Sequence, residues 1–378
     1  MSDVVVGILG GYGTVGRATA HHLRTWAGAS VRLRIGGRRA DAASAFVSAE
    51  LGGDAEAVGV DLDSPSELDR FADGCAVVVN CAGPSRRAYD RAARAARDAG
   101  AGYVDAAGEE PLRDRLADPA SGWRGPAVLN AGMFPGLSGL LPRCLYRAER
   151  FDRADRLLGY VGGIDRFTPG AAGDYVESLF SGSSEGGVAW RGGVRTPNAL
   201  RRLTGVELPF FPDAVTAQPG LTSEVDTLVE ALHLSDVDWY NVFPGDRVLD
   251  VLRRIQGTAP ADRDVAAATG ELIAAAELDR AGRRSYQLFV YQLEGTIDGG
   301  RAVRTLVLRG EDGYGLSGMV TALAAVEVLE GAVPDGAHFA ADVLDPDRTW
   351  SWVRDSPAVT TCRVVDGPAG EDTDEGEL

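Results

Sequence analysis

A glycine-rich turn near the start of the chain limits the fold more than any other stretch. The apolar run Val4–Leu9 leads into Gly11, Gly13 and Gly16, and an amphipathic run follows. This G-x-G-x-x-G spacing lets a buried parallel strand turn tightly into a helix, lets the backbone approach a pyrophosphate, and lets the helix pack on the strand. Phosphates bind at the N–H groups that open such a helix. The turn therefore predicts a dinucleotide site, formed by Gly11, Tyr12, Gly13, Thr14, Val15 and Gly16.

The end of the next expected strand predicts which dinucleotide binds. Residues 30–35 alternate like a strand and lead into two glycines and two arginines. An NAD site usually has a carboxylate here for the ribose 2′-hydroxyl, whereas the 2′-phosphate of NADP needs that carboxylate absent and a guanidinium nearby. We therefore expect Gly37, Arg38 and Arg39 to bind NADP; the alternative is that the two arginines only begin a solvated helix. Asp61, after the third expected strand, either reaches the adenine or caps the next helix.

The fourth expected strand, Cys75–Asn80, is continuous in valine, as a parallel strand covered on both faces must be. The turn after it exposes its backbone at the carboxyl edge of the sheet, where ligands of open α/β sheets bind. We expect five residues of this turn to contact the cofactor: Asn80, Cys81, Ala82, Gly83 and Pro84. A strand at 102–105 and another at 127–132 complete the expected parallel sheet.

Composition excludes several kinds of chemistry. The chain has no lysine, so all 38 of its basic residues are arginine. This rules out a lysine Schiff base, lysine-bound pyridoxal phosphate, a Walker A lysine and a lysine proton relay. The net charge of −17 argues against a nucleic-acid partner, because such a protein needs a basic face. The four cysteines show no paired spacing, so we expect neither a disulfide nor a metal site.

The distribution of apolar residues predicts where the protein is found. No run approaches the ~18 consecutive apolar residues of a membrane span. No charged region followed by an apolar stretch opens the chain as a signal peptide would. We therefore expect a cytoplasmic protein with no membrane partner.

Three later motifs resemble, in order, those of the saccharopine dehydrogenase-like NADP-dependent reductases, a group that includes trans-acting enoyl reductases. Residues 79–84 are similar to the family's N-x-x-G-P turn, residues 101–109 to its Y-x-D-x-x-G-E segment, and residues 132–137 to its G-x-x-P-G-L turn. The resemblance covers residues 1 to about 150 and returns weakly at 318–331. It implies an α/β protein whose N-terminal Rossmann domain is completed by a C-terminal helix. It also implies an inserted α+β domain, with a mixed sheet that covers the nicotinamide and forms a homodimer.

The expected domains follow from this resemblance and from two local patterns. Residues 318–330 are apolar nearly all round, so this helix needs partners on more than one side. Two alternating segments joined by Asp298-Gly299-Gly300 predict a hairpin of the substrate sheet. We expect the Rossmann NADP-binding domain at 1–136 and 312–360, the substrate-binding and dimerisation domain at 137–311, and a disordered acidic tail at 364–378.

Four residues are candidates for the chemistry. Glu109 should face the nicotinamide by its position in the second motif, although a carboxylate that only begins a helix is an equal alternative. Asp174 and Tyr175 lie in the glycine-rich opening of the second domain, where a loop could close over substrate. Arg191 nearby could clamp a carboxylate, or it could be an ordinary surface arginine. None of the four histidines occupies a place expected of a general acid.

These features predict an NADP-dependent reductase that acts on a C=N bond, in an imine or cyclic imine, by hydride transfer. Saccharopine-type enzymes interconvert an imine and an amine. An iminium already carries the charge that attracts hydride, so it needs little acid catalysis, which suits a chain without lysine or an obvious catalytic histidine. We expect a role in secondary metabolism. The alternatives are an enoyl or carbonyl reductase of the same family and a non-catalytic NADP-binding protein.

Overall fold

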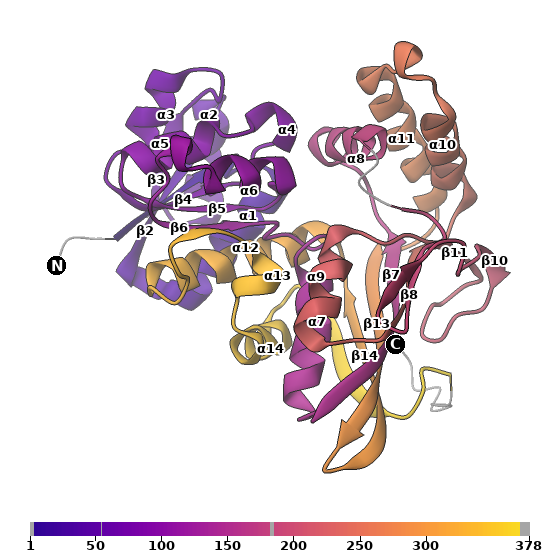
Figure 1. Cartoon of the computed structure of the whole chain (residues 1–378). Helices are drawn as coiled ribbons and strands as arrows, with labels where there is room; N and C mark the ends of the chain where they lie inside the picture. The colour runs from indigo at the N-terminus through magenta and orange to yellow at the C-terminus, as the bar shows by residue number, and fades with distance from the viewer. Residues whose placement is uncertain (1–3, 54, 182–184, 371–378) are drawn as a thin grey trace. The chain divides into compact units, whose positions relative to one another are not determined.

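The computed structural model describes residues 4–53, 55–181 and 185–370, which form two compact units. Unit 1 comprises Met1–Leu137 and Tyr314–Asp345, and unit 2 comprises Ser138–Gly313 and Pro346–Leu378. In Figure 1, orange and yellow helices from late in the chain accompany the indigo and purple elements of unit 1. Each unit is therefore built from two separate stretches of sequence.

Unit 1 holds a sheet of seven parallel strands in the order β15-β6-β5-β4-β1-β2-β3. The strands are β1 (Val4–Leu9), β2 (Val31–Gly37), β3 (Ala55–Gly59), β4 (Cys75–Asn80), β5 (Gly102–Asp105), β6 (Pro126–Leu129) and β15 (Gly336–Phe339). The helices are α1 (Thr14–Ala27), α2 (Ala40–Glu50), α3 (Pro65–Ala72), α4 (Ser85–Ala88), α5 (Arg91–Asp98), α6 (Glu110–Ala117), α12 (Gly313–Leu329) and α13 (Ala340–Val343). This is the strand order of a Rossmann fold, extended at one edge by β15.

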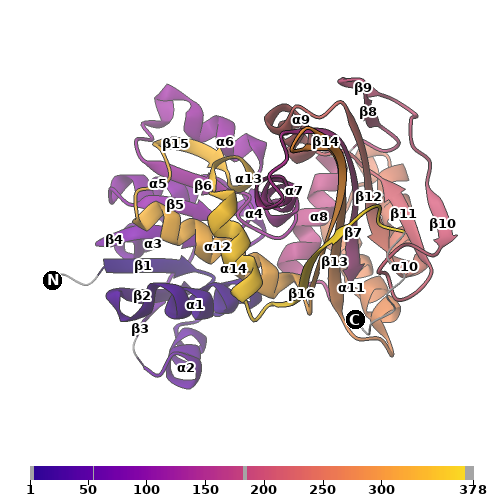
Figure 2. The same cartoon turned by 90° about the horizontal axis from the view of Figure 1, so that it is seen from below.

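Helices cover both faces of this sheet, as the continuous valines of β4 predict (Figure 2). Tyr103 of β5 packs in a buried cluster with residues of α3, α5 and α6. Its neighbour Gly102 points to the opposite face, where an added Cβ would touch the side chain of Val328 in α12. On that face α12 also packs against α1, because Gly318 lies directly against Ala18. The expected closing helix thus completes the core of the Rossmann unit.

Unit 2 contains a mixed sheet of nine strands. Its main path runs β10-β11-β12-β7-β13-β14-β16, and β8 pairs with β12 and β9. Only β12 and β7 run parallel, and the other pairs are antiparallel. The strands are β7 (Arg153–Ile164), β8 (Ala189–Arg191), β9 (Val194–Thr196), β10 (Leu203–Val206), β11 (Val215–Pro219), β12 (Asp236–Phe243), β13 (Tyr286–Ile297), β14 (Gly300–Gly310) and β16 (Val359–Asp366).

The expected hairpin is β13 and β14, and its turn has the predicted chemistry. Asp298 and Gly299 both have positive φ, at 50° and 74°, as a tight turn between twisted strands requires. The helices of unit 2 are α7 (Leu137–Ala148), α8 (Pro169–Ser181), α9 (Ser223–Leu232), α10 (Asp246–Gly257), α11 (Val265–Arg280) and α14 (Pro346–Asp355). Side chains of α8, α10 and α11 form one hydrophobic cluster. On one sheet face the Tyr291 hydroxyl donates to the Ser138 carbonyl of α7, at 2.9 Å.

The fold class is therefore confirmed: a Rossmann unit completed by a C-terminal helix, and a second unit with a mixed sheet. Two expected boundaries are corrected. Residues 346–360 were expected in the Rossmann domain but belong to unit 2, because α14 leads into β16, which pairs with β14. The expected tail at 364–378 begins inside β16, and the Ala369 N–H then donates to the Gln292 side chain at 3.0 Å. Residues 371–378 lie outside the described residues.

Candidate functional site

The glycines of the turn after β1 have two different roles. Gly10 and Gly16 allow close packing of the backbone, and Gly13 leaves the surface open. Gly10 has φ of +69°, and a Cβ there would lie 2.8 Å from the Ala82 nitrogen in the turn after β4. Gly16 is packed so closely on the Gly10 carbonyl that no side chain fits. Gly13 instead is exposed at the N-terminus of α1, and among the described residues the only heavy atom within 4 Å of an added Cβ is the Gly10 oxygen, at 3.0 Å. The backbone at Gly13 is thus open to a phosphate.

The two arginines after β2 have no counter-ion among the residues that the structure describes. Gly37 makes room for the ring of Tyr12, which an added Cβ would strike. The Tyr12 hydroxyl accepts from the Arg39 N–H at 3.1 Å, and the Arg39 guanidinium lies 5.9 Å from the centre of the Tyr12 ring. Arg38 and Arg39 are exposed, and neither forms an ion pair with any residue that the structure describes. The pair suits the 2′-phosphate of NADP.

Asp61 stabilises the turn after β3. Its carboxylate accepts from the Asp63 N–H at 3.0 Å, and its own N–H donates to Glu67 at 2.9 Å. The N-cap position of α3 is Ser64, not Asp61. The helix-cap alternative for Asp61 is therefore wrong, and a contact with adenine stays a prediction.

A buried polar network joins the ends of β4 and β5. Asn80 donates to Asp105 at 3.0 Å, and the Tyr103 hydroxyl donates to the same carboxylate oxygen at 2.6 Å. The Asn80 side-chain oxygen accepts from the Ala82 N–H at 3.2 Å, which fixes the turn that follows. Burial raises the pKa of Asp105, while the hydrogen bonds from Asn80 and Tyr103 oppose that rise. Burial raises the pKa of Tyr103 well above its ordinary value, so this hydroxyl is held as a donor to Asp105.

The rest of the turn after β4 shows mainly backbone. The Cys81 N–H donates to the Leu9 carbonyl at 2.9 Å, and its thiol lies 3.6 Å from the Thr19 hydroxyl. Burial raises the pKa of this thiol to about 12, so Cys81 is not a nucleophile. Gly83 is exposed, and Pro84 occupies the N-cap position of α4. That Asn80, Cys81, Ala82, Gly83 and Pro84 contact the cofactor remains a prediction, which their place at the carboxyl edge supports.

Glu109 meets a residue that sequence reasoning missed. It occupies the N-cap position of α6, but its side chain makes no capping hydrogen bond and instead forms an ion pair with Arg86 of α4. The Gly108 N–H beside it donates to the Ser85 hydroxyl at 3.3 Å. The loops after β4 and β5 are thus held together at the edge of the sheet. The available signal was the position of Arg86, two residues after the Gly-Pro of the first motif.

The third motif is held by the closing helix. The Thr321 hydroxyl of α12 donates to the Ala131 carbonyl at 2.7 Å, and the Met133 N–H donates to the Ser317 side chain at 3.1 Å. The Leu137 N–H closes the turn on the Gly132 carbonyl at 2.9 Å. Residues 131–133 and the first half of α12 are therefore in direct contact within unit 1.

The three candidates in unit 2 come from two elements, α8 and β8. Tyr175 stacks on Phe167 at 6.0 Å and packs against the helical cluster of α8, α10 and α11. Burial raises its pKa to about 12, which makes its hydroxyl a weak proton donor near neutral pH. Asp174 precedes it in α8, whereas Arg191 ends β8. That Asp174, Tyr175 and Arg191 group around a closing loop stays a prediction.

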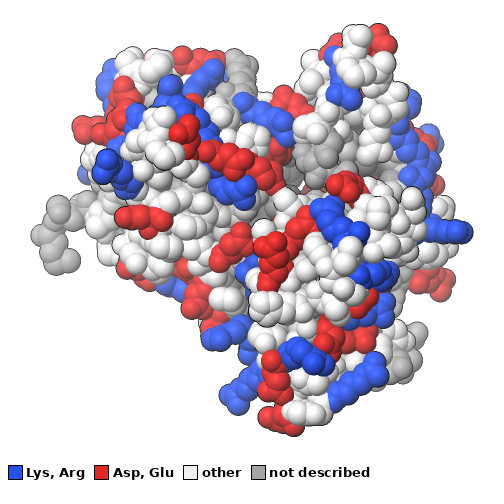
Figure 3. Space-filling view, viewed as in Figure 1, with Lys and Arg blue, Asp and Glu red and all other residues white. Residues whose placement is uncertain are grey.

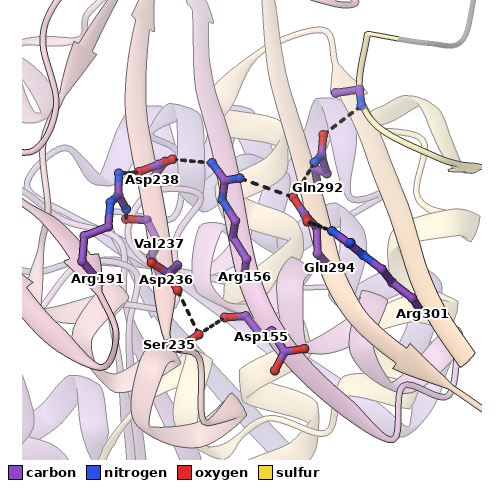
Figure 4. Close-up of polar contacts among 11 residues, drawn as sticks. Asp155, Arg156, Arg191, Ser235, Asp236, Val237, Asp238, Gln292, Glu294 and Arg301 are labelled. Atoms are coloured by element: carbon purple, nitrogen blue, oxygen red, sulfur yellow. Dashed lines mark hydrogen bonds and ion pairs between the residues drawn. The ribbon is translucent and has the colours of Figure 1, made fainter. Parts of the chain in front are cut away.

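Arg191 belongs to a row of alternating charges across the sheet (Figure 4). It donates to Asp238 of β12 at 2.5 Å, and Arg156 of β7 donates to the other oxygen of that carboxylate at 2.8 Å. Arg156 also lies 3.6 Å from Glu294 of β13, which lies 3.6 Å from Arg301 of β14. The Asp238 side chain is only 9% exposed, so it needs both cations. The Arg191 guanidinium is therefore engaged in an ion pair within unit 2.

The sequence comparison agrees with the edge geometry of unit 1. Residues 6–122 match the family model of the saccharopine dehydrogenase NADP-binding domain. Unit 1 is a saccharopine dehydrogenase-type NADP-binding domain. This confirms both the expected family and NADP as the cofactor. The open backbone at Gly13 and the unpaired cations at Arg38 and Arg39 fit that group.

A solved structure shares the fold over nearly the whole chain. Saccharopine dehydrogenase (L-Glu forming) from Saccharomyces cerevisiae is 14% identical, with 97% of this chain and 100% of that chain covered at a TM-score of 0.65. DAP dehydrogenase from C. glutamicum is 15% identical over 93% and 96% of the two chains, with a TM-score of 0.47. No curated protein sequence matches this one significantly. The family model thus covers residues 6–122 with an NADP-binding domain, and the solved structure of saccharopine dehydrogenase shares the two-unit fold.

The surface and the remaining searches add three observations. On the face drawn in Figure 3, arginines are interspersed with Asp and Glu rather than gathered in one basic stripe. Within the described ranges, every helix is too short or too polar to cross a membrane. In the same part of the chain, no group of three His, Cys, Asp or Glu side chains is arranged to hold a metal ion.

Proposed function

We propose that this protein reduces the C=N bond of an imine or cyclic imine, with NADPH as the hydride donor, at the carboxyl ends of β4 and β5. The observation that carries this proposal is the Arg86–Glu109 pair, which lies on the half of the sheet edge away from Arg38 and Arg39. In a Rossmann unit the adenosine half of the cofactor lies toward β2, so the nicotinamide extends toward β4 and β5. Glu109 is then the acidic group nearest the reacting carbon.

The supply of protons favours a C=N bond over a carbonyl. NADPH, when bound, supplies the hydride. The new C–H bond forms at the imine carbon, and the π electrons of C=N move to nitrogen, so a protonated imine becomes a neutral amine. No further proton is needed in that step, whereas a ketone must receive one at oxygen. The Tyr103 hydroxyl is fully buried and bonded to Asp105, so it does not serve as a donor.

The carboxylate of Glu109 has a defined part in this reaction. Placed beside the substrate nitrogen, it favours the protonated iminium by charge attraction and so makes the carbon a better hydride acceptor. Asp174, Tyr175 and Arg191 are not assigned a part. The family resemblance also supports a homodimer formed through the sheet of unit 2, and we further propose a cytoplasmic protein with a role in secondary metabolism.

Product analysis tests this proposal. The protein is incubated with NADPH and matched panels of cyclic imines, ketones and α,β-unsaturated carbonyl compounds, and products are identified by mass. We expect amines from the imine panel, with incorporation of one deuterium from cofactor labelled at C4. Alcohols or saturated carbonyl products without amines would contradict the proposal, and binding of NADPH with no product from any panel would favour a non-catalytic protein.

A further inference from the structure

We propose that Arg86 is the substrate anchor, binding a carboxylate or another anionic group near the reducible bond, and that Glu109 is the counter-ion it exchanges on substrate binding. This inference rests on the proposed function. The sequence suggested Arg191 as the residue that binds a substrate carboxylate, but Arg191 pairs with Asp238. Arg86 lies instead after β4, on the side of the sheet edge where the nicotinamide is expected. This role of Arg86 also explains why an ion pair is placed where the reaction is expected.

The framework around the pair is fixed, while the pair itself is accessible. The Ser85 hydroxyl accepts from the Gly108 N–H, and the Tyr89 hydroxyl donates to the Pro111 carbonyl at 3.4 Å, so α4 and the start of α6 are joined on either side of the pair. The side chains of Arg86 and Glu109 are 32% and 25% exposed. A ligand can therefore reach both charges without opening the fold.

Accessibility decides which arginine can change partners. A partly exposed ion pair contributes little net free energy, about 0–1 kcal/mol, because water solvates both charges when the pair opens. Opening a buried pair leaves an uncompensated charge and costs several times more. Asp238 is 9% exposed and binds two arginines, so Arg191 is held. Glu109 is nearly three times as exposed, so Arg86 can be released.

The exchange leaves the charge of the site unchanged. A substrate with an anionic group and an iminium nitrogen brings one negative and one positive charge. The guanidinium can bind a carboxylate through two parallel N–H groups, which fixes the direction of approach. Glu109, once released, remains next to the position of the nitrogen. One pair is thus replaced by two, and the substrate is held at both ends of its dipole.

Four variants test the assignment with a matched pair of substrates, a cyclic imine carboxylate and its methyl ester. We expect Arg86→Met to raise KM for the carboxylate by about 30-fold or more, as loss of a charge partner does, and to change KM for the ester by no more than about twofold. Arg86→Lys should recover part of the loss. Glu109→Gln should lower kcat for both substrates, because the carboxylate that favours the iminium is gone. Its effect on KM should be smaller than that of Arg86→Met, since loss of the competing anion and loss of the partner of the nitrogen oppose each other.

Arg115→Met is the control variant. Arg115 lies at the other end of α6, pairs with Asp90 at 3.3 Å and is 35% exposed, so the same substitution removes an arginine of similar exposure that is paired to a carboxylate. Its KM values should match those of the unchanged protein. NADPH affinity, measured by fluorescence, should be equal in Arg115→Met and the unchanged protein, and in the other variants it shows whether a change in KM arises from the substrate or from the cofactor.

Two results would overturn the assignment. One is an equal rise in KM for carboxylate and ester in Arg86→Met, and the other is a Glu109→Gln variant that keeps the kcat of the unchanged protein. Calorimetry of a cyclic amino acid, the reduced product, with NADP-loaded protein gives the same comparison without turnover. Failure of the proposed function has a different signature, because the unchanged protein then reduces ketones or enones instead, and the acid and ester of that class replace the imines in the same variants.

Discussion

Arginine has opposite roles at the carboxyl edge of the sheet in unit 1, where the nucleotide is expected, and on the sheet of unit 2. At the edge, Arg38 and Arg39 are exposed and have no ion pair among the described residues. On the sheet, Arg191 and Arg156 share Asp238, and the row continues to Glu294. Free cations can accept the charge of a ligand, whereas cations already paired to a buried carboxylate stabilise the fold.

Arg86 lies between these two cases. Like the arginines of the sheet it forms an ion pair, but its carboxylate partner is more accessible to solvent than Asp238 is. The comparison teaches that the exposure of the counter-ion, more than the exposure of the arginine, tells which arginines can bind a ligand. Arg191 and Arg86 are almost equally exposed, at 35% and 32%, yet their partners differ from 9% to 25%.

The largest expected effect comes from closing the edge itself. Gly13→Val should weaken NADPH binding by about 1,000-fold, roughly 4 kcal/mol, because the new side chain occupies the approach of the pyrophosphate. Fluorescence titration measures the affinity, and circular dichroism should show an intact fold. Gly125→Val is the matched control, since an added Cβ there has no heavy atom within 4 Å among the described residues. NADPH-induced thermal stabilisation that survives in Gly13→Val would contradict this view of the turn.

The next effect should appear in unit 2 as a loss of stability. Asp238→Ala leaves Arg156 and Arg191 without their shared counter-ion, and we expect the free energy of unfolding to fall by about 2–3 kcal/mol. Urea titration measures it. Asp250→Ala removes an exposed ion pair with Arg253 and should cost less than about 0.5 kcal/mol. An equal, small loss in both variants would mean that the row on the sheet is not a stabilising element.

The cofactor preference gives a smaller effect. Replacing Arg38 and Arg39 together by alanine should lower the NADPH to NADH affinity ratio by about 10- to 30-fold, because two charge-assisted contacts to the 2′-phosphate are lost. The salt dependence of NADPH binding should weaken as well. Arg70→Ala, on α3, serves as the control. An unchanged ratio in the double variant would show that the 2′-phosphate binds elsewhere.

The smallest effect is expected at Arg191. Arg191→Ala should lower the free energy of unfolding by about 1–2 kcal/mol, less than Asp238→Ala does, because Arg156 still pairs with Asp238. KM for the imine carboxylate should change by less than about twofold. A large rise in KM, with NADPH affinity unchanged, would restore Arg191 as an anchor and remove the distinction between the two regions.

Local pattern was sufficient for the Rossmann unit. The continuous valines of β4 predicted burial on both faces, and the glycine spacing predicted the turn into α1. The apolar circumference of residues 318–330 predicted a helix with several partners, and α12 contacts both α1 and β5. These features can be predicted because the residue pattern of each strand or helix reflects how that element is buried.

The features that sequence reasoning missed depend on distant partners. β16 has eight residues and is ordered by pairing with β14, a partner about fifty positions earlier. Arg191 was indistinguishable from a ligand-binding arginine until Asp238, 47 residues away, was found beside it. Arg86 and Glu109 are likewise joined only when β4 and β5 become neighbours. No local period encodes such pairs.

The division of unit 1 between two stretches of chain has a consequence for its biosynthesis. When Leu137 leaves the ribosome, the sheet still lacks β15, and the face of Gly102 lacks α12. The whole of Ser138–Gly313 must be translated first, which takes roughly 10–35 s at 5–20 residues per second. During that interval an incomplete nucleotide domain exposes apolar surface. Newly made chains should therefore depend on chaperones until Tyr314–Asp345 has been translated and the closing helix docks.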